Sequence, residues 1–168
     1  MRNILFFFSS TTIGGAETNI VRISRELALR GYKIHWAFLI NNGPLLELVD
    51  FEVKVIETGF YYKSYLKFKK LYITFLRENR IECVLNFGLK VEIISRLLSK
   101  RAGVKRIISN IRSTDDWRKG YHTWLDIITQ RNVDVWVANS FAGKKAFHLR
   151  EKIPLNKIEV IYNFIETD

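Results

Sequence analysis

Residues 4–17 read ILFFFSSTTIGGAE, an apolar run followed by a polar loop that carries two adjacent glycines. An amphipathic stretch then runs to Gly31, and a second apolar run covers residues 33–40. This order predicts a strand, a loop, a helix and a second strand. The first backbone N–H groups of such a helix lack intrahelical partners, and the helix dipole is positive at that end. Because Gly14 and Gly15 carry no Cβ, a phosphate or a sugar could approach the backbone, and we expect a ligand site beside residues 9–17.

Apolar runs and amphipathic stretches alternate along the rest of the chain. We expect further strands at residues 51–56, 82–86, 105–109, 133–138 and 157–162, and helices at residues 61–79, 89–100, 115–131 and 141–152. Gly103 and Ser140 are the residue types of a helix C-cap and N-cap. Short strands that are apolar throughout are typical of a parallel sheet covered on both faces. The sequence therefore predicts an α/β fold, a Rossmann-like doubly wound parallel sheet, whose ligands bind beyond the carboxyl ends of the strands.

The composition narrows the classes of partner. The chain has 168 residues and a formal net charge of +10, with 27 Lys and Arg against 17 Asp and Glu. The length suits one domain, and the charge predicts anionic partners such as phosphates or acidic lipids. The sequence carries no helix-turn-helix, zinc or RNP-type signature, so we expect no nucleic-acid partner.

The apolar run at the N-terminus is shorter than the about 7 residues of a signal-peptide core, and no stretch approaches the roughly 18 of a membrane span. We therefore expect a cytoplasmic protein that can lie at the inner membrane face. Cys83 sits in an apolar run without a basic neighbour, as expected for a buried structural thiol. His35, His122 and His148 lack the spacing of metal ligands, so we expect neither a metal nor a cofactor.

The glycine loop differs from two well-known phosphate-binding motifs. Its glycines are adjacent, no third glycine follows, and no acidic residue closes the second strand, so it departs from the dinucleotide fingerprint. It also lacks the Gly-Lys-Ser/Thr of a P-loop. Two interpretations stay open, a functional ligand loop and a tight structural turn.

Two side chains follow later strands. Arg112 could hold a phosphate or a carboxylate through two parallel hydrogen bonds, and a solvated surface arginine is the alternative. Ser140 also follows a strand, but capping the next helix would explain this residue by itself.

Residues 61–80 combine basic and aromatic side chains. The stretch has six Lys and Arg and one acid, Glu78, and its apolar residues form two stripes at helical spacing. One stripe suffices for packing onto the sheet, so the other could face an anionic membrane. The residues expected at that membrane surface are Lys63, Lys67, Lys69 and Lys70. The alternative is a core helix with a solvated basic face.

Both ends of the chain resemble one enzyme family. Residues 13–17 (IGGAE) with the following residues 20–32 resemble the opening of GT-B fold glycosyltransferases of family 4. Residues 135–140 (VWVANS) and 157–166 (KIEVIYNFIE) resemble the segment that closes their N-terminal domain. Phe164 and Glu166 depart from the usual linker, and Arg112 occupies the neighbourhood where many relatives carry a histidine.

The resemblance implies an architecture and roles for individual residues. Residues 1–162 would form the acceptor-binding, N-terminal half of a GT-B fold, residues 163–168 would begin the interdomain linker, and the donor-binding C-terminal domain is absent from this chain. Gly14 and Gly15 would face the donor diphosphate and sugar. Glu17, Arg112 and Ser140 would contact the acceptor or a phosphate, and Asn163 would lie at the hinge.

The implied activity is retaining, hexosyltransferase-type transfer without a metal. The donor would be a nucleotide sugar, and the acceptor a glycan or a lipid diphosphate, as in surface-polysaccharide assembly. The chain by itself would be inactive, because half of the cleft is missing. The alternative is a non-catalytic Rossmann-like module that binds a nucleotide or an acidic partner.

Overall fold

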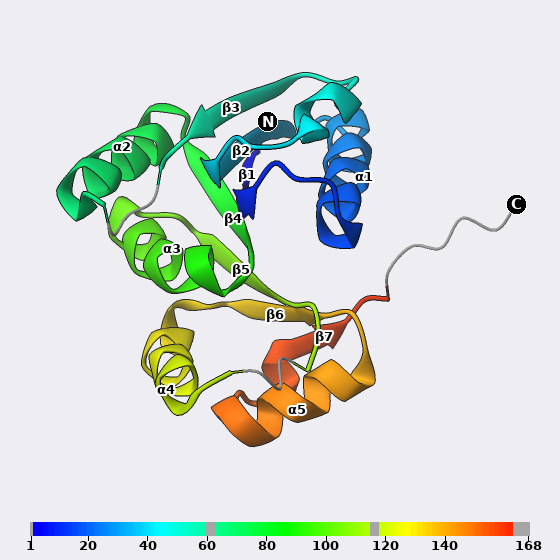
Figure 1. Cartoon of the computed structure of the whole chain (residues 1–168), viewed down its shortest axis with the longest axis vertical. Coiled ribbons are helices and arrows are strands. Elements are labelled where there is room, and N and C mark those ends of the chain that lie inside the picture. The colour runs from blue at the N-terminus through cyan, green and yellow to red at the C-terminus, as the bar shows by residue number, and fades with distance from the viewer. Residues whose placement is uncertain (1, 60–62, 115–117, 163–168) are drawn as a thin grey trace, which may run out of the picture.

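The computed structural model describes residues 2–59, 63–114 and 118–162. These residues form one sheet of seven strands in the order β3-β2-β1-β4-β5-β6-β7, and every neighbouring pair is parallel (Figure 1). The strands are β1 (Asn3–Ser10), β2 (Lys33–Ile40), β3 (Val53–Glu57), β4 (Ile81–Phe87), β5 (Arg106–Ile111), β6 (Val135–Ala138) and β7 (Ile158–Val160). The predicted doubly wound α/β fold is therefore confirmed.

Five helices connect the strands, with α1 on one face of the sheet and α2 and α3 on the other (Figure 1). They are α1 (Gly15–Leu29), α2 (Tyr65–Glu78), α3 (Leu89–Ala102), α4 (Gly120–Thr129) and α5 (Phe141–Glu151). Short 3-10 turns occur at Pro44–Leu48, Gln130–Asn132 and Leu155–Lys157. Gly103 ends α3 in the left-handed conformation, as predicted.

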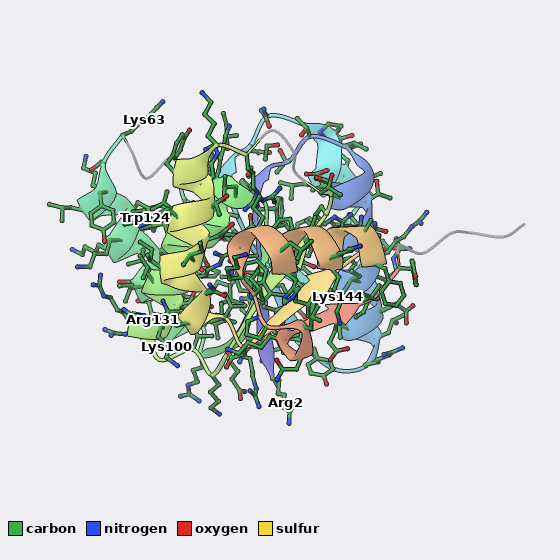
Figure 2. The ribbon with its side chains drawn as sticks, turned by 90° about the horizontal axis from the view of Figure 1, so that it is seen from below. Arg2, Lys63, Lys100, Trp124, Arg131 and Lys144 are labelled. Carbon is green, nitrogen blue, oxygen red and sulfur yellow. The ribbon has the colours of Figure 1, made fainter. Side chains whose placement is uncertain are left out.

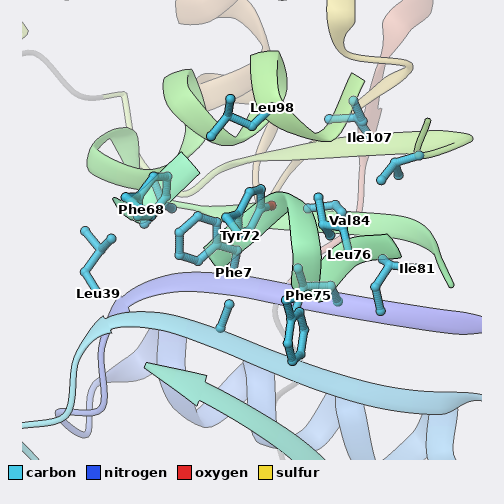
Figure 3. Packing of buried hydrophobic residues seen from close by; sticks show 14 residues of the cluster. Phe7, Leu39, Phe68, Tyr72, Phe75, Leu76, Ile81, Val84, Leu98 and Ile107 are labelled. Carbon is cyan, nitrogen blue, oxygen red and sulfur yellow. The ribbon is translucent and has the colours of Figure 1, made fainter. Parts of the chain in front are cut away.

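Side chains that alternate along β1 feed two cores. Leu5 and Phe7 belong to the cluster under α2 and α3, where the Phe7 ring stacks on Tyr72 with centroids 5.1 Å apart (Figure 3). Phe6 and Phe8 point to the other face and join the cluster that contains Ile20 of α1. Both faces of this apolar strand are therefore buried, as expected for a parallel sheet that is covered on both sides.

Several boundaries differ from the sequence prediction. The fourth helix begins at Gly120 and not at residues 115–116, which lie outside the described residues; a ring nitrogen of His122 accepts a hydrogen bond from the Lys119 backbone N–H at this start. The second helix begins at Tyr65, and the last strand spans only Ile158–Val160. Proline and polar residues surround these ends, where local pattern is weakest.

Candidate functional site

The strand order reverses between β1 and β4. From β1 the chain builds outward to β2 and β3, then returns to place β4 on the other side of β1. The loops that leave the carboxyl ends of β1 and β4 lead directly into α1 and α3. A Cβ built on Gly88, whose φ is +94°, would lie 3.7 Å from Oγ of Ser9, so the two loops are neighbours. Two helix N-termini therefore meet at the switch point, where ligands of doubly wound sheets bind.

The first turn of α1 is open to solvent. Gly14 is the N-cap with extended backbone (φ −152°), and no described side chain caps the helix. A Cβ on Gly15 would meet nothing within 4 Å, whereas one on Gly14 would lie 2.8 Å from Oε2 of Glu17. Neither glycine has a positive φ, so the backbone conformation at these positions does not demand glycine. Because Gly15 has no Cβ, space remains open beside the backbone at this position.

The loop after β2 clamps the loop after β1. The buried Thr11 hydroxyl donates to Oδ1 of Asn41 at 2.7 Å and accepts from the backbone N–H groups of Asn42 and Gly43, each at 3.0 Å. A Cβ on Gly43 would come within 2.6 Å of the Thr11 carbonyl oxygen and of Thr12 Cα. Sequence reasoning missed this clamp, because Thr11 and Asn41 lie thirty residues apart in the chain.

Arg112 follows β5 and lies within electrostatic range of Glu17. Burial of the half-buried guanidinium lowers the pKa of Arg112, and the Glu17 carboxylate opposes that shift. The amide of Asn139, at the end of β6, donates to the Arg112 carbonyl oxygen at 2.8 Å. The fold thus brings three predicted features, Gly15, Glu17 and Arg112, to the same edge of the sheet.

Ser140 has a structural role in this chain. Its Oγ accepts a hydrogen bond from the Gly143 N–H at 3.1 Å and caps α5. This cap was predicted, and it uses the hydroxyl that a ligand would otherwise contact. Asn163 lies outside the described residues.

A buried charge network, missed by sequence reasoning, lies under the β5 side of this edge. Arg96 is fully buried; its Nε donates to Oγ of Ser109 at 3.0 Å, and its Nη2 donates to Oε2 of Glu92 at 2.5 Å. Its Nη1 donates to Asp126 and, at 3.1 Å, to the Thr129 hydroxyl. The guanidinium also stacks 4.5 Å from the Trp136 ring centroid.

The network continues into α5 and touches the backbone near Arg112. Arg118 donates to Asp126 and to Glu151, and Arg150 donates to Glu151 at 2.8 Å. The other oxygen of Glu92 accepts from the Asn110 N–H at 3.3 Å, two residues before Arg112. Burial, with Asp126 adding to it and Arg96 opposing it, raises the pKa of Glu92 to about 7. A charged pair at i and i+4 on the sheet-facing side of α3 was the signal available in the sequence.

Asn86 is a second buried polar group near the switch point. It is the penultimate residue of β4 and is fully buried, and neither atom of its side-chain amide has a partner among the described residues. The backbone carbonyl oxygen of Asn86 accepts a hydrogen bond from the side-chain amide of Asn110 at 3.0 Å. Orphaned buried amides are rare in folded proteins, so Asn86 stands out at this edge.

The opposite, amino-terminal end of the strands carries different chemistry. A groove of about 1060 Å³ opens there between β1, β2 and the ends of α1 and α2. Burial, with Lys54 and Lys33 nearby, lowers the pKa of His35 in its wall to about 4. Burial also raises the pKa of Cys83 to about 11, which suits the structural thiol that we predicted and not a nucleophile.

The basic helix α2 buries residues of both apolar stripes, since Leu76 is buried and Ile73 packs against the same core. Phe68, Tyr72 and Phe75 are buried, while Leu66 is 75% exposed. Among the predicted membrane-facing residues, Lys63, Lys67 and Lys70 are exposed and Lys69 is half-buried. Within the described part of the chain, no helix has the length and hydropathy to cross a membrane, and no cluster of His, Cys, Asp and Glu could hold a metal ion.

One family model matches most of the chain. A family model described as Glycosyltransferase Family 4 matches residues 13–168. A search of curated protein sequences gave no significant match.

Several solved structures have the same fold. HepE of Anabaena in complex with UDP-glucose aligns with a TM-score of 0.80 and 16% identity over 99% of this chain and 45% of that chain. The lipopolysaccharide outer core galactosyltransferase WaaB, in its apo form, aligns with a TM-score of 0.73 and 16% identity over 98% and 46%. A glycosyltransferase from Rickettsia africae aligns with a TM-score of 0.77 and 18% identity over 96% of this chain and 42% of that chain.

The chain spans less than half of the length of each of these structures. Its seven-stranded parallel sheet is the Rossmann-like half of a GT-B fold, as the resemblance implied. Since the family model covers nearly the whole chain, the protein belongs to glycosyltransferase family 4.

Proposed function

We propose that this chain is the acceptor-side, N-terminal half of a retaining glycosyltransferase that moves a hexosyl group from a nucleotide sugar to a lipid-linked or polysaccharide acceptor. The observation that carries the proposal is the uncapped first turn of α1, open at Gly15 and placed at the switch point of the sheet. A helix N-terminus without a capping side chain suits a diphosphate, because its N–H groups and dipole both favour negative charge.

The donor would lie between this half and a second domain. Negative charge develops on the leaving diphosphate during transfer, and the N–H groups after Gly14 and Gly15 would stabilise that charge. HepE was solved with UDP-glucose, which supports a nucleotide sugar as the class of donor. Arg112 would bind a phosphate or the acceptor, with Glu17 setting the orientation of its guanidinium.

The acceptor side is assigned from charge and location. The net charge of +10 and the exposed Lys63, Lys67 and Lys70 of the α2 region favour an anionic surface. A lipid-diphosphate acceptor at the cytoplasmic face of a membrane has that character. Ser140 would contribute mainly by capping α5. Asn163 would act as the hinge toward the second domain.

The test is activity of the full-length protein on a panel of nucleotide sugars with polyprenyl-diphosphate sugars as acceptors. We expect turnover, and the anomeric configuration of the product, read by NMR, would match that of the donor. The isolated 168-residue chain should not turn over. Sugar transfer by the isolated chain would contradict the two-domain hypothesis. Nucleotide binding without sugar transfer by the full-length protein would favour a non-catalytic module.

The Gly15→Val variant tests the site itself. Since a Cβ at this position meets no protein atom, the melting temperature should barely change. The added branch would intrude on the ligand, and kcat/KM should fall at least about a hundredfold, comparable with the loss of one oxyanion contact. An equal loss of stability and activity would mean that the glycine pair is only a structural turn.

A further inference from the structure

Helix α4 turns a broad apolar face to solvent. Tyr121, Trp124 and Ile128 are 58%, 59% and 42% exposed, and Ile127 beside them is 40% exposed. Their spacing of three and four residues puts them on one side of the helix. The other side of α4 holds the buried Asp126 and Thr129 of the charge network, so the exposed face is not an alternative packing surface for the sheet. Clusters of large exposed apolar side chains mark interaction surfaces.

Basic side chains lie on the same side of the molecule as this apolar face. Helix α3 packs against both α2 and α4, so the three helices form one side of the molecule (Figure 1). Figure 2 shows Lys63, Trp124, Arg131 and Lys100 along that side. The exposed basic residues of the three helices are Lys67, Lys70, Arg77, Lys90, Lys100 and Arg101. Within these helices, all of which the structure describes, Glu78 is the one exposed acid, because Glu92 and Asp126 are buried.

The pairing of aromatic and basic side chains selects among partners. A second copy of this chain would bring two basic surfaces together across a two-fold axis, which the net charge of +10 disfavours. Nucleic acid would satisfy the lysines and arginines but would leave Ile127 and Ile128 exposed to water. An anionic bilayer accommodates both, since Trp and Tyr favour the headgroup boundary and each nearby Lys or Arg binds acidic lipid.

We propose that α4 is a membrane-insertion element, which places Tyr121, Trp124 and Ile128 in the headgroup region of an anionic bilayer while the basic residues of α2 and α3 bind lipid phosphates. The inference rests on the proposed transfer to a lipid-linked acceptor, which keeps the enzyme at a membrane. It shifts the apolar contact from α2, where sequence analysis put it, to α4, and it leaves α2 with the electrostatic part.

Vesicle binding by the full-length protein tests the proposal. The double variant Trp124→Ser/Ile128→Ser should bind vesicles of phosphatidylglycerol and phosphatidylcholine at least about tenfold more weakly than the parent. The matched control is Ile23→Ser/Leu29→Ser on α1, where the two side chains are 41% and 76% exposed on the opposite face of the sheet. The control should change binding by less than about twofold.

Tryptophan fluorescence provides an independent readout. Trp36 and Trp136 are fully buried, so in a Trp117→Phe background the response to a bilayer comes from Trp124. Its emission should move to shorter wavelength with anionic vesicles and should be quenched by lipids brominated along the acyl chain. Emission that does not respond would overturn insertion.

Three other results would also overturn the proposal. The first is binding that the α4 variant retains but that replacement of Lys63, Lys67 and Lys70 abolishes, since the attraction would then be purely electrostatic. The second is the absence of vesicle binding. The third is self-association that depends on Trp124, seen by sedimentation without lipid. The proposed function is judged separately, because the α4 variant should keep the parent's turnover on a short-chain, water-soluble acceptor.

Discussion

The half of the sheet around β1 and the half around β6 are both covered by helices, but different chemistry holds them together. Around β1, the rings of Phe7, Phe68 and Tyr72 stack within a cluster that is almost entirely apolar. Around β6, an apolar cluster with Trp136 and Phe147 lies beside six ionisable side chains, which come from α3, α4, α5 and the loop before α4. The apolar half gains stability from area removed from water, whereas the charged half also depends on each buried charge keeping its partner.

The largest expected effect comes from breaking the charged half. Arg96→Met keeps much of the side-chain volume but leaves Glu92 and Asp126 without their shared cation. Loss of one partner from a buried network costs about 3–5 kcal/mol, so we expect a decrease of that size in the free energy of unfolding. Urea denaturation at neutral pH measures the change.

A compensating variant distinguishes charge from packing. The double variant Glu92→Leu/Arg96→Met removes the buried carboxylate along with its partner, and it should recover part of the loss. A double variant that is no more stable than Arg96→Met would mean that shape, and not charge balance, holds this half together.

The second effect probes the loops of the apolar half. Gly43→Ala would place a Cβ within 2.6 Å of the backbone at Thr11 and Thr12, where no flexible side chain can move aside. Forced overlaps of this kind cost about 1–3 kcal/mol. Gly15→Ala is the matched control, since its Cβ meets open space and should leave thermal unfolding unchanged. Equal melting temperatures for the two variants would argue against the clamp.

The third effect is a dependence of folding stability on pH, which has opposite signs in the two halves. The pKa of Glu92 is raised from 4.5 to about 7, so the folded state holds its proton to higher pH than the unfolded state. This contribution to stability is complete below about pH 4.5 and is lost as the pH rises through 7, at up to about 1.4 kcal/mol per pH unit. His35 acts in the opposite direction: its pKa is lowered from 6.5 to about 4, so stability rises with pH between those values.

Single variants assign each slope. Glu92→Gln should remove the decrease in stability between pH 4.5 and 7, and His35→Gln should remove the increase between pH 4 and 6.5. Urea unfolding at stepped pH measures both. Profiles of the two variants that both superimpose on the parent's would show that neither group controls the pH dependence.

The smallest effect is expected at Tyr72, whose hydroxyl makes polar contacts within the apolar half. The Tyr72 hydroxyl hydrogen-bonds Oγ of Ser95 at 2.8 Å and of Ser99 at 3.1 Å. Tyr72→Phe should cost only about 1 kcal/mol, because the two serine hydroxyls lie 3.4 Å apart and can still pair with each other. A loss as large as that of Arg96→Met, in the same assay, would mean that the two halves are not as different as their composition indicates.

The same contrast explains what the sequence could predict. The strands of the apolar half, β1 and β2, were located within two residues because a continuous apolar run carries its own signal. The glycine loop and Arg112 could be singled out, since both directly follow strands. The charge network could not, because Arg96 and Asp126 lie thirty residues apart and nothing local says that both are buried. The exposed face of α4 was missed for a related reason: helical periodicity does not reveal which stripe the sheet covers.

The position of β1 has a consequence for synthesis on the ribosome. This strand emerges before the other six strands, yet it is central and completes its pairing only with β4, since Phe8 lies beside both Phe38 and Phe87. At roughly 5–20 residues per second, β1 must wait several seconds for β4 to be translated. During that interval three consecutive phenylalanines, residues 6–8, have a free hydrogen-bonding edge. The nascent chain should therefore depend on chaperone protection until residue 87 has left the exit tunnel, well before the charged half exists.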